Sequence, residues 1–199
     1  MPLVPYDRRG ALIALGAALL SPALAFAQSA PDPRQPIRYL ERALTPADGR
    51  VPAPAAVRAA VERSFDTGAI ARAVLASHAN GATAAQLARF REALTGRIVR
   101  DLLRRLRPDR RGQLEITHSR PIGAGEWLVT SRVLVPGERP RAIGWRVGAS
   151  RGAPRISDVL GSGTSMVRVL RNEYGGALRR LGIDGVATRM EERNRRRPG

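Results

Sequence analysis

The spacing of apolar residues changes in the middle of the chain, from the period of a helix to that of a strand. Between Thr83 and about Leu106, apolar residues recur every three or four positions, and arginines mostly occupy the positions between them. This repeat places the apolar side chains on one side of a helix, for which Thr83 has the hydroxyl of an N-terminal cap. The apolar positions are Leu87, Phe90, Leu94, Ile98, Leu102 and Leu106. We predict a long amphipathic helix that ends before Pro108 and Gly112.

After Gly112, apolar and polar residues alternate with the two-residue period of a β-strand. Four such stretches follow one another, over residues 114–119, 127–135, 143–147 and 155–160. Short segments containing glycine, and in places proline, separate them, so each stretch can pair with the next as an antiparallel neighbour. The pattern predicts a four-stranded antiparallel sheet.

Shorter helices are predicted before the long helix and after the sheet. Asp66 or Thr67 has the side chain of a helix cap in front of one of them. The predicted ranges are 37–44, 55–63 and 68–76 on the N-terminal side, and 164–181 and 184–193 on the C-terminal side. This order of elements gives the fold class α+β, with N-terminal helices, a four-stranded antiparallel sheet and C-terminal helices.

Residues 1–27 have the composition of a cleaved secretory signal peptide. Residues 8–9 are a basic pair, residues 11–27 carry no charge, and residues 25–27 read Ala-Phe-Ala, as at a cleavage site. A membrane-spanning helix is the alternative, but the apolar run is shorter than the ~20 residues that span a bilayer, and Pro22 interrupts it. The arginine pair also fits twin-arginine export, although its neighbours favour the general route. We expect a periplasmic protein.

Three further regions follow the predicted signal peptide. Residues 28–36 are polar and contain three prolines, which predicts a flexible lead-in. Residues 37–192 form one domain that is large enough to bury a core. Residues 193–199 are a basic tail that we expect to be frayed.

The residue types needed for common active sites and metal sites are scarce. The chain has no cysteine, which excludes disulfides, thiolate metal ligands and a lipid anchor on cysteine. Its two histidines, His78 and His118, lack the spacing of a metal site. A histidine with Ser119 and Asp158 would have the residue types of a hydrolase triad, but the sequence of a nucleophile elbow is absent. We predict that the protein is not an enzyme and needs no metal or cofactor.

The formal net charge is +17, and all 34 basic residues are arginine. Such a charge is typical of proteins that bind nucleic acid. The predicted signal peptide removes the protein from that partner, and the use of arginine alone, together with many alanines, is typical of a GC-rich genome. We therefore expect no nucleic-acid partner, and a surface that is attracted to anionic membranes or to acidic proteins in a salt-dependent way.

Residues 161–165, Gly-Ser-Gly-Thr-Ser, separate the last predicted strand from a helix. A phosphate group can bind at such a helix start, although dinucleotide-binding and P-loop patterns are absent. The simpler interpretation is a turn followed by a cap on Thr164 or Ser165. An approach of these amides, or of Arg171, to a phosphate stays open.

Several groups of residues occur in an order that is found in one known family. They are Phe65-Asp66 with Ile70, Val74 and Leu75; Thr83 with Gln86 and Phe90; Trp145-Arg146 with residues 156–159; Asp158, Val159, Gly163 and Ser165; and Arg171, Tyr174, Gly182, Asp184 and Gly185. The order resembles the MlaC family of periplasmic phospholipid carriers, also called the toluene-tolerance family, over about residues 37–192. Ala79, Leu102 and Pro154 stand where the family usually has tryptophan, tyrosine and tryptophan.

The resemblance implies an MlaC-like fold (of the nuclear-transport-factor-2-like kind), in which helices over a curved sheet enclose an apolar lipid cavity. It also implies a monomeric carrier of phospholipid, or of another lipid, between an outer-membrane lipoprotein or porin partner and an inner-membrane ABC-type transport complex. Ser165 and Arg171 are the candidates for the lipid headgroup at the mouth. The candidate lining residues are Phe65, Val74, Phe90, Leu94, Ile98, Leu102, Val129, Val133, Trp145, Val147, Met166, Leu170 and Tyr174.

Three alternatives stay open at this point. The missing aromatic residues are compatible with another hydrophobic cargo, such as a hopanoid. The lining residues would also form an ordinary core, in which case the protein is an envelope adaptor without a ligand. A periplasmic hydrolase would need His78 or His118 beside a serine and an aspartate.

Overall fold

The computed structural model describes residues 31–46, 48–106, 112–150 and 152–196. The predicted signal peptide, the beginning of the lead-in and the last three residues of the basic tail lie outside these ranges. Within the described ranges, no helix is both long enough and apolar enough to cross a lipid bilayer.

The predicted helix caps are present in the N-terminal half. The Asp66 carboxylate accepts a hydrogen bond from the Ala69 N–H at 2.8 Å. The Thr83 hydroxyl accepts from the Gln86 N–H, and the Gln86 side chain accepts from the Thr83 N–H, both at 3.1 Å, which completes a capping box. The elements are α1 (Gln35–Leu44), α2 (Pro54–Ser64), α3 (Thr67–Leu75), the 3-10 helix η1 (Ala76–Ala79) and α4 (Ala84–Arg105).

The sheet is antiparallel, and its spatial order, β1-β2-β3-β4-β5, is the order of the sequence. All four predicted strands are confirmed. A short fifth strand is added, because Thr164 and Ser165 pair with Gly161 and Leu160 before the last helix begins. The strands are β1 (Gln113–Gly123), β2 (Glu126–Leu134), β3 (Arg141–Ser150), β4 (Ala153–Gly161) and β5 (Thr164–Ser165).

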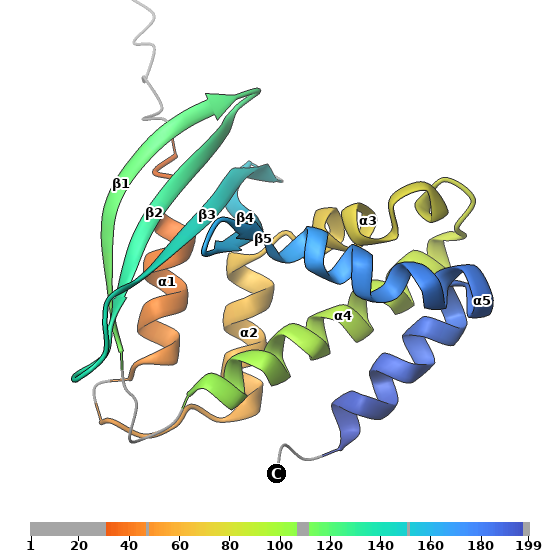
Figure 1. Cartoon of the computed structure of the whole chain (residues 1–199), viewed down its shortest axis with the longest axis horizontal. Coiled ribbons are helices and arrows are strands. Elements are labelled where there is room, and N and C mark those ends of the chain that lie inside the picture. Colours follow the sequence, from red (N-terminus) through yellow and green to blue (C-terminus); the bar gives the residue numbers. More distant parts are fainter. Residues whose placement is uncertain (1–30, 47, 107–111, 151, 197–199) are drawn as a thin grey trace, which may run out of the picture. The chain divides into compact units, whose positions relative to one another are not determined.

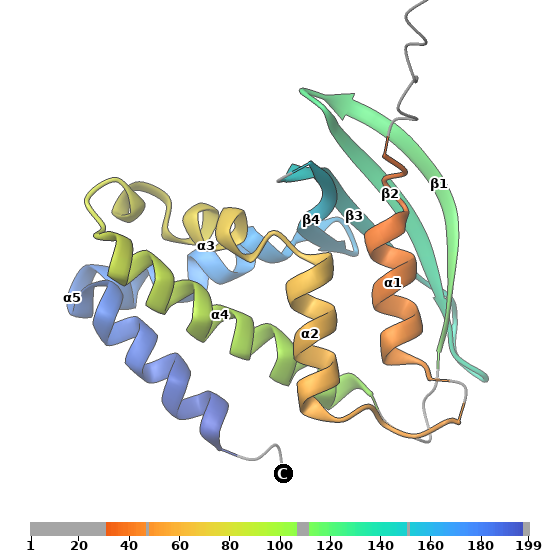
Figure 2. The same ribbon diagram turned by 180° about the vertical axis from the view of Figure 1, so that it is seen from behind.

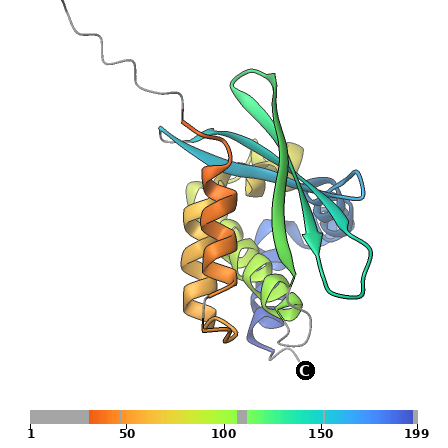
Figure 3. The same cartoon turned by 90° about the vertical axis from the view of Figure 1, so that its left-hand side faces the viewer.

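Strand β1 forms one edge of the sheet and is irregular. Its register on β2 shifts between Ile116 and His118 and again between Pro121 and Gly123. Figure 3 shows the β1–β2 hairpin extending beyond α1. The sheet is therefore longer on this side than the helix beneath it.

Helix α5 (Met166–Arg195) is two helices joined at a kink. The backbone of Gly182 there has φ 66° and ψ −175°, which is not helical. Glycine is almost the only residue that adopts this conformation. Two C-terminal helices with a break near residue 182 were predicted, and the structure confirms the break. The first of them begins two residues later than predicted because Thr164 and Ser165 belong to β5.

The helices lie on one side of the sheet (Figure 1). The opposite view shows α1 and α2 against its inner face (Figure 2). Helix α5 runs from the β5 edge along α3 and α4. The core lies between these layers, and its largest fully buried side chains are Phe90, Ile37, Ile70, Leu75, Leu94, Ile156 and Met190.

Helix α4 crosses the second half of α5 at close range near Gly96. A Cβ atom at position 96 would lie 2.6 Å from the Asn194 side-chain nitrogen. That nitrogen donates to the Ala93 carbonyl at 2.8 Å. Gly96 costs the helix roughly 1 kcal/mol relative to alanine, and its role is to let the two helices approach.

Candidate functional site

Most of the side chains predicted to line a cavity are buried together in one apolar core. The rings of Phe90 and Tyr174 meet edge to face, with centroids 6.5 Å apart. The buried members are Phe65, Val74, Phe90, Leu94, Ile98, Val129, Trp145, Val147, Leu170 and Tyr174. Leu102 and Met166 are half-buried against the same core, and Val133 is half-buried on β2. The structure thus brings all of the predicted residues except Val133 together in one core, and their role in binding stays a prediction.

The inner face of the sheet carries apolar side chains that are only half-buried. The register places Leu114 opposite Val133, and Ile143 opposite Ser131. Because side chains on every second residue of a strand share a face, these residues lie on the same face as the buried Val129. We call Leu114, Ile116, Trp127, Val133 and Ile143 the inner-sheet face; all are half-buried.

Sequence reasoning named only Val133 from the inner-sheet face. The alternation that predicted the strands also identified the other four positions as apolar. It did not show that they would be less covered than Val129, because cover depends on where the helices lie.

Two hydroxyl groups interrupt this apolar surface. Ser131 accepts a hydrogen bond from the Trp145 indole N–H at 2.9 Å. Ser119 is paired with Val129 in the sheet, and its Oγ is buried without a hydrogen-bond partner among the described residues. A buried hydroxyl without a partner is costly, and it is available to a polar group of a ligand.

The C-terminal sequence motif holds the start of α5 in place. The Asp158 carboxylate accepts from the Ser165 hydroxyl at 2.6 Å and from the Val167 N–H at 3.1 Å. Ser165 is the N-cap of α5, and its hydroxyl accepts from the Arg168 N–H at 3.1 Å. Ser165 therefore already makes the bonds that a headgroup would use. Its role in headgroup binding stays a prediction.

The other predicted headgroup residue, Arg171, lies beside a groove of about 400 Å³ between α3–η1 and α5. Its guanidinium donates to the Ala73 carbonyl through Nε at 3.0 Å and Nη2 at 2.6 Å. These bonds tie α5 to the end of α3. Arg171 and Ser165 are placed by different contacts, and no described contact joins them.

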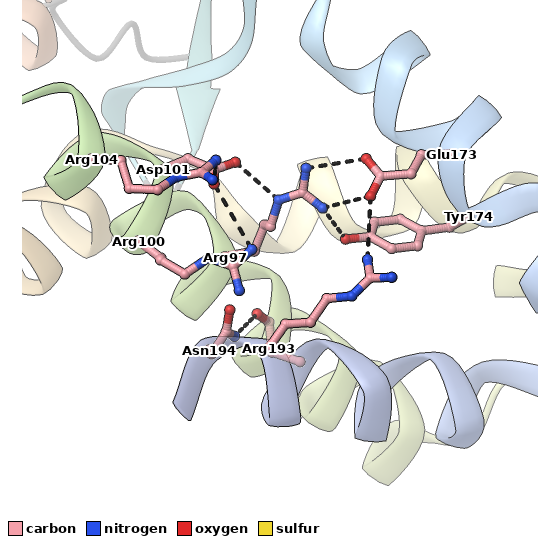
Figure 4. Close-up of polar contacts among 9 residues, drawn as sticks. Arg97, Arg100, Asp101, Arg104, Glu173, Tyr174, Arg193 and Asn194 are labelled. Carbon is pink, nitrogen blue, oxygen red and sulfur yellow. Dashed lines mark hydrogen bonds and ion pairs between the residues drawn. The ribbon is translucent and has the colours of Figure 1, made fainter. Parts of the chain in front are cut away.

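Arg97 joins α4 to α5 (Figure 4). Its guanidinium donates to Glu173 at 2.8 and 3.1 Å and to the Tyr174 hydroxyl at 2.5 Å, and its Nε donates to Asp101 at 2.9 Å. The hydrogen bond to Glu173 raises the pKa of Arg97, which stays charged. Burial raises the pKa of Tyr174 above its ordinary value, although the nearby Arg97 opposes this effect.

Asp158 and His78, which were candidates for a catalytic triad, make other contacts. Asp158 bonds to Ser165 and to backbone groups, and His78 contacts the Leu75 carbonyl through Nδ1 at 3.2 Å. In the described part of the chain, no group of three or more histidine and acidic side chains is placed to hold a metal ion.

A solved structure with the same fold is the phospholipid-binding protein from Ralstonia solanacearum in complex with a phospholipid. The two chains are 20% identical with a TM-score of 0.68, over 81% of this chain and 93% of that one. No curated protein sequence matches the chain significantly. The family model of the MlaC protein matches residues 47–192, well over half of the chain, and the chain therefore belongs to the MlaC family.

Proposed function

We propose that the protein is a carrier that binds a phospholipid, with the acyl chains between the inner-sheet face and the helices. MlaC proteins are non-enzymatic lipid-binding carriers. The Ralstonia solanacearum protein of the same fold is a phospholipid-binding protein. Family membership therefore supports a lipid as the cargo, and the site follows from the surface that this chain offers.

The half-buried inner-sheet face is the observation that carries the proposal. Four of its five apolar side chains, all but Val133, pack against the buried core, and Val133 lies opposite Leu114 in the sheet. The backbone between them is hydrogen-bonded within the sheet. An acyl chain that covers this face leaves water without exposing unpaired backbone groups. Each methylene group that leaves water contributes about 0.8 kcal/mol.

Binding along this face requires a separation of sheet and helices. The buried members of the predicted lining already contact one another, so an acyl chain reaches them only if these contacts open. The β1–β2 side of the sheet is the place for this opening, because the helices contact mainly β4 and β5. Separation there breaks few contacts between the sheet and the helices, and the acyl chain replaces most of them.

Ser119 is the polar contact that we assign to the bound lipid. Its unpartnered hydroxyl lies beside Val129. A hydroxyl at this depth can donate to an ester carbonyl of the lipid, and the bond would remove the cost of its burial. The headgroup then stays at the margin of the sheet, in contact with water.

We place the carrier in the periplasm, where it moves lipid between an outer-membrane lipoprotein or porin partner and an inner-membrane ABC-type transport complex. The sequence of residues 1–27 supports secretion. A bound acyl chain shielded by apolar side chains can cross an aqueous compartment that a free lipid crosses slowly.

The first test is native mass spectrometry of protein purified from the periplasm without detergent, with extraction of the bound lipid. A stoichiometric two-chain phospholipid is the expected result. A polycyclic lipid would replace the proposed cargo by a hopanoid. A bare protein that takes no lipid from liposomes would favour the adaptor without a ligand.

A matched pair of variants tests the site. Ile143 is half-buried on the inner-sheet face, whereas its neighbour Ala142 is exposed and points to the other face. Ile143→Glu should reduce the recovered lipid at least tenfold, because a carboxylate would be buried against acyl chains. Ala142→Glu adds the same charge and should leave lipid recovery unchanged. Equal recovery from two folded variants would place the site elsewhere.

A further inference from the structure

Helix α5 carries acidic residues mainly on the side that faces α4. Arg97 binds Glu173, and Arg89 lies 3.5 Å from Asp184 and 2.9 Å from Glu191. Arginines of α4 thus neutralise the acidic residues of α5. Among the arginines of α5, Arg193 also lies 3.8 Å from Glu173, whereas those of the first half other than Arg171 form no side-chain bond with a described residue.

The opposite side of the first half of α5 is basic and partly apolar. We call Arg168, Val169, Asn172, Gly175, Gly176, Arg179 and Arg180 the α5 outer face; the helical spacing of these residues places them on one side of the helix. The side chains of its three arginines form no hydrogen bond or ion pair with any described residue. Val169 is 48% exposed.

Two grooves flank the α5 outer face. The groove of about 400 Å³ is lined by Arg179 and the groove of about 340 Å³ by Arg180, and Asn172 and Gly176 border both. The second groove also contains Arg189 beyond the kink and has the buried Met190 in its floor. Glu173 also lines the second groove, where it is bound to Arg97 and Arg193. Each groove therefore still offers at least one guanidinium without an acidic partner among the described residues.

Gly175 and Gly176 lie between the grooves, inside a helix that they weaken. Each costs roughly 0.5–1 kcal/mol relative to alanine. A Cβ atom at position 175 would meet nothing closer than Arg179 Nη1 at 3.8 Å, so contacts within the protein do not require glycine there. Because glycine has no side chain, the helix surface between the two grooves is open to an external group.

We propose that the α5 outer face docks on the anionic surface of a phospholipid membrane. Guanidinium groups bind phosphate oxygens in pairs, and arginines near an anionic bilayer are attracted to it. Val169, which lies on this face, can enter the interface between headgroups and acyl chains. An acidic protein would match the arginines, but the exposed apolar side chain of Val169 among them favours a membrane. This surface lies outside the proposed cargo site, and it would hold the carrier where lipid enters or leaves.

The test is sedimentation of the purified protein with vesicles of phosphatidylcholine alone or with added phosphatidylglycerol. The charge variant is Arg168→Gln/Arg179→Gln/Arg180→Gln. The control, Arg120→Gln/Arg132→Gln/Arg139→Gln, removes three exposed arginines, two on strands of the sheet and one between β2 and β3, whose side chains also form no hydrogen bond or ion pair with described residues. At about fivefold per arginine, binding of the charge variant to anionic vesicles should fall roughly 100-fold, and that of the control much less.

Other outcomes would overturn the proposal. An equal loss of binding to anionic vesicles in both variants would mean that total charge alone drives binding. Absence of vesicle binding, with retention on immobilised polyglutamate that only the charge variant loses, would assign the face to an acidic protein. Loss of vesicle binding in inorganic phosphate, but not in chloride of the same ionic strength, would assign the grooves to free phosphate.

Cargo is measured separately in the same samples. The charge variant should retain the lipid that the unmodified protein carries, because its three arginines lie outside the inner-sheet face. If neither protein carries lipid while docking still depends on the α5 outer face, the proposed carrier function fails and the docking proposal stands.

Discussion

Asp158 is almost completely buried, and its carboxylate receives the Ser165 hydroxyl and the Val167 N–H at the start of α5. The spacing of these residues belongs to the most informative motif of the sequence. Its explanation in this structure is the joining of β4 to α5, rather than contact with a ligand. A motif that looks like a site can therefore be a requirement of the fold.

We expect Asp158→Ala to lower the free energy of unfolding by about 2–3 kcal/mol, because it leaves the half-buried Ser165 hydroxyl and the buried Val167 N–H without acceptors. Urea unfolding followed by circular dichroism measures this change. Asp158→Asn keeps one oxygen acceptor and should lower the free energy of unfolding by clearly less. Similar losses in the two variants would contradict the capping role.

Tyr174 should make stability depend on alkaline pH. Its pKa is raised by burial, so above pH ~10 the unfolded state releases the phenolic proton while the folded state retains it. The free energy of unfolding should therefore fall as the pH rises from about 10. Tyr174→Phe cannot ionise and should show a shallower fall. Parallel pH profiles for the two proteins would show that the ionisation of Tyr174 is not linked to folding.

At the scale of elements, the kink in α5 depends on the positive φ of one residue. Gly182→Ala should lower the free energy of unfolding by about 1–3 kcal/mol, because alanine is strained at φ 66° and ψ −175°. Gly175→Ala, in a helical position with open space, should raise it by about 0.5–1 kcal/mol. Thermal unfolding of both variants measures the contrast, and two destabilised proteins would mean that position 175 is more confined than the structure has it.

The elements with a strong local signal were predictable. Helix α4 has a cap on Thr83 and a regular apolar stripe, and the alternation in β2 and β3 extends over several residues. Strand β5 was missed because two residues carry no period, and their pairing with Gly161 and Leu160 depends on the turn. The need for Gly96 was also hidden, since Asn194 is almost one hundred positions away in the sequence.

For the whole molecule, basic residues outnumber acidic ones by 34 to 17, so the average interaction between charges is repulsive. Salt screens this repulsion over a Debye length of about 10 Å at 0.1 M. We expect the melting temperature to rise when sodium chloride increases from 20 to roughly 200 mM. A decrease would mean that ion pairs such as Arg97–Glu173 outweigh the net repulsion.

The candidate site was predictable in part at this scale. Apolar periodicity identified residues that share a core, such as Phe90 and Trp145. It could not separate buried residues from the half-buried inner-sheet face, nor find the α5 outer face, because exposure depends on elements packed from distant parts of the chain. The resemblance to a family supplied the expectation of a cargo, and the structure supplied the surfaces on which to test it.

The irregular register of β1 has a consequence for the behaviour of the protein at high concentration. An edge strand offers its free N–H and C=O groups to a strand of another molecule, which is how many β-proteins begin to form fibrils. The two bulges of β1 bend that edge, and Pro121 has no N–H to donate. A second strand could therefore follow β1 for only a few residues. The protein can therefore have an apolar sheet face next to an unpaired edge strand and still resist aggregation through that strand.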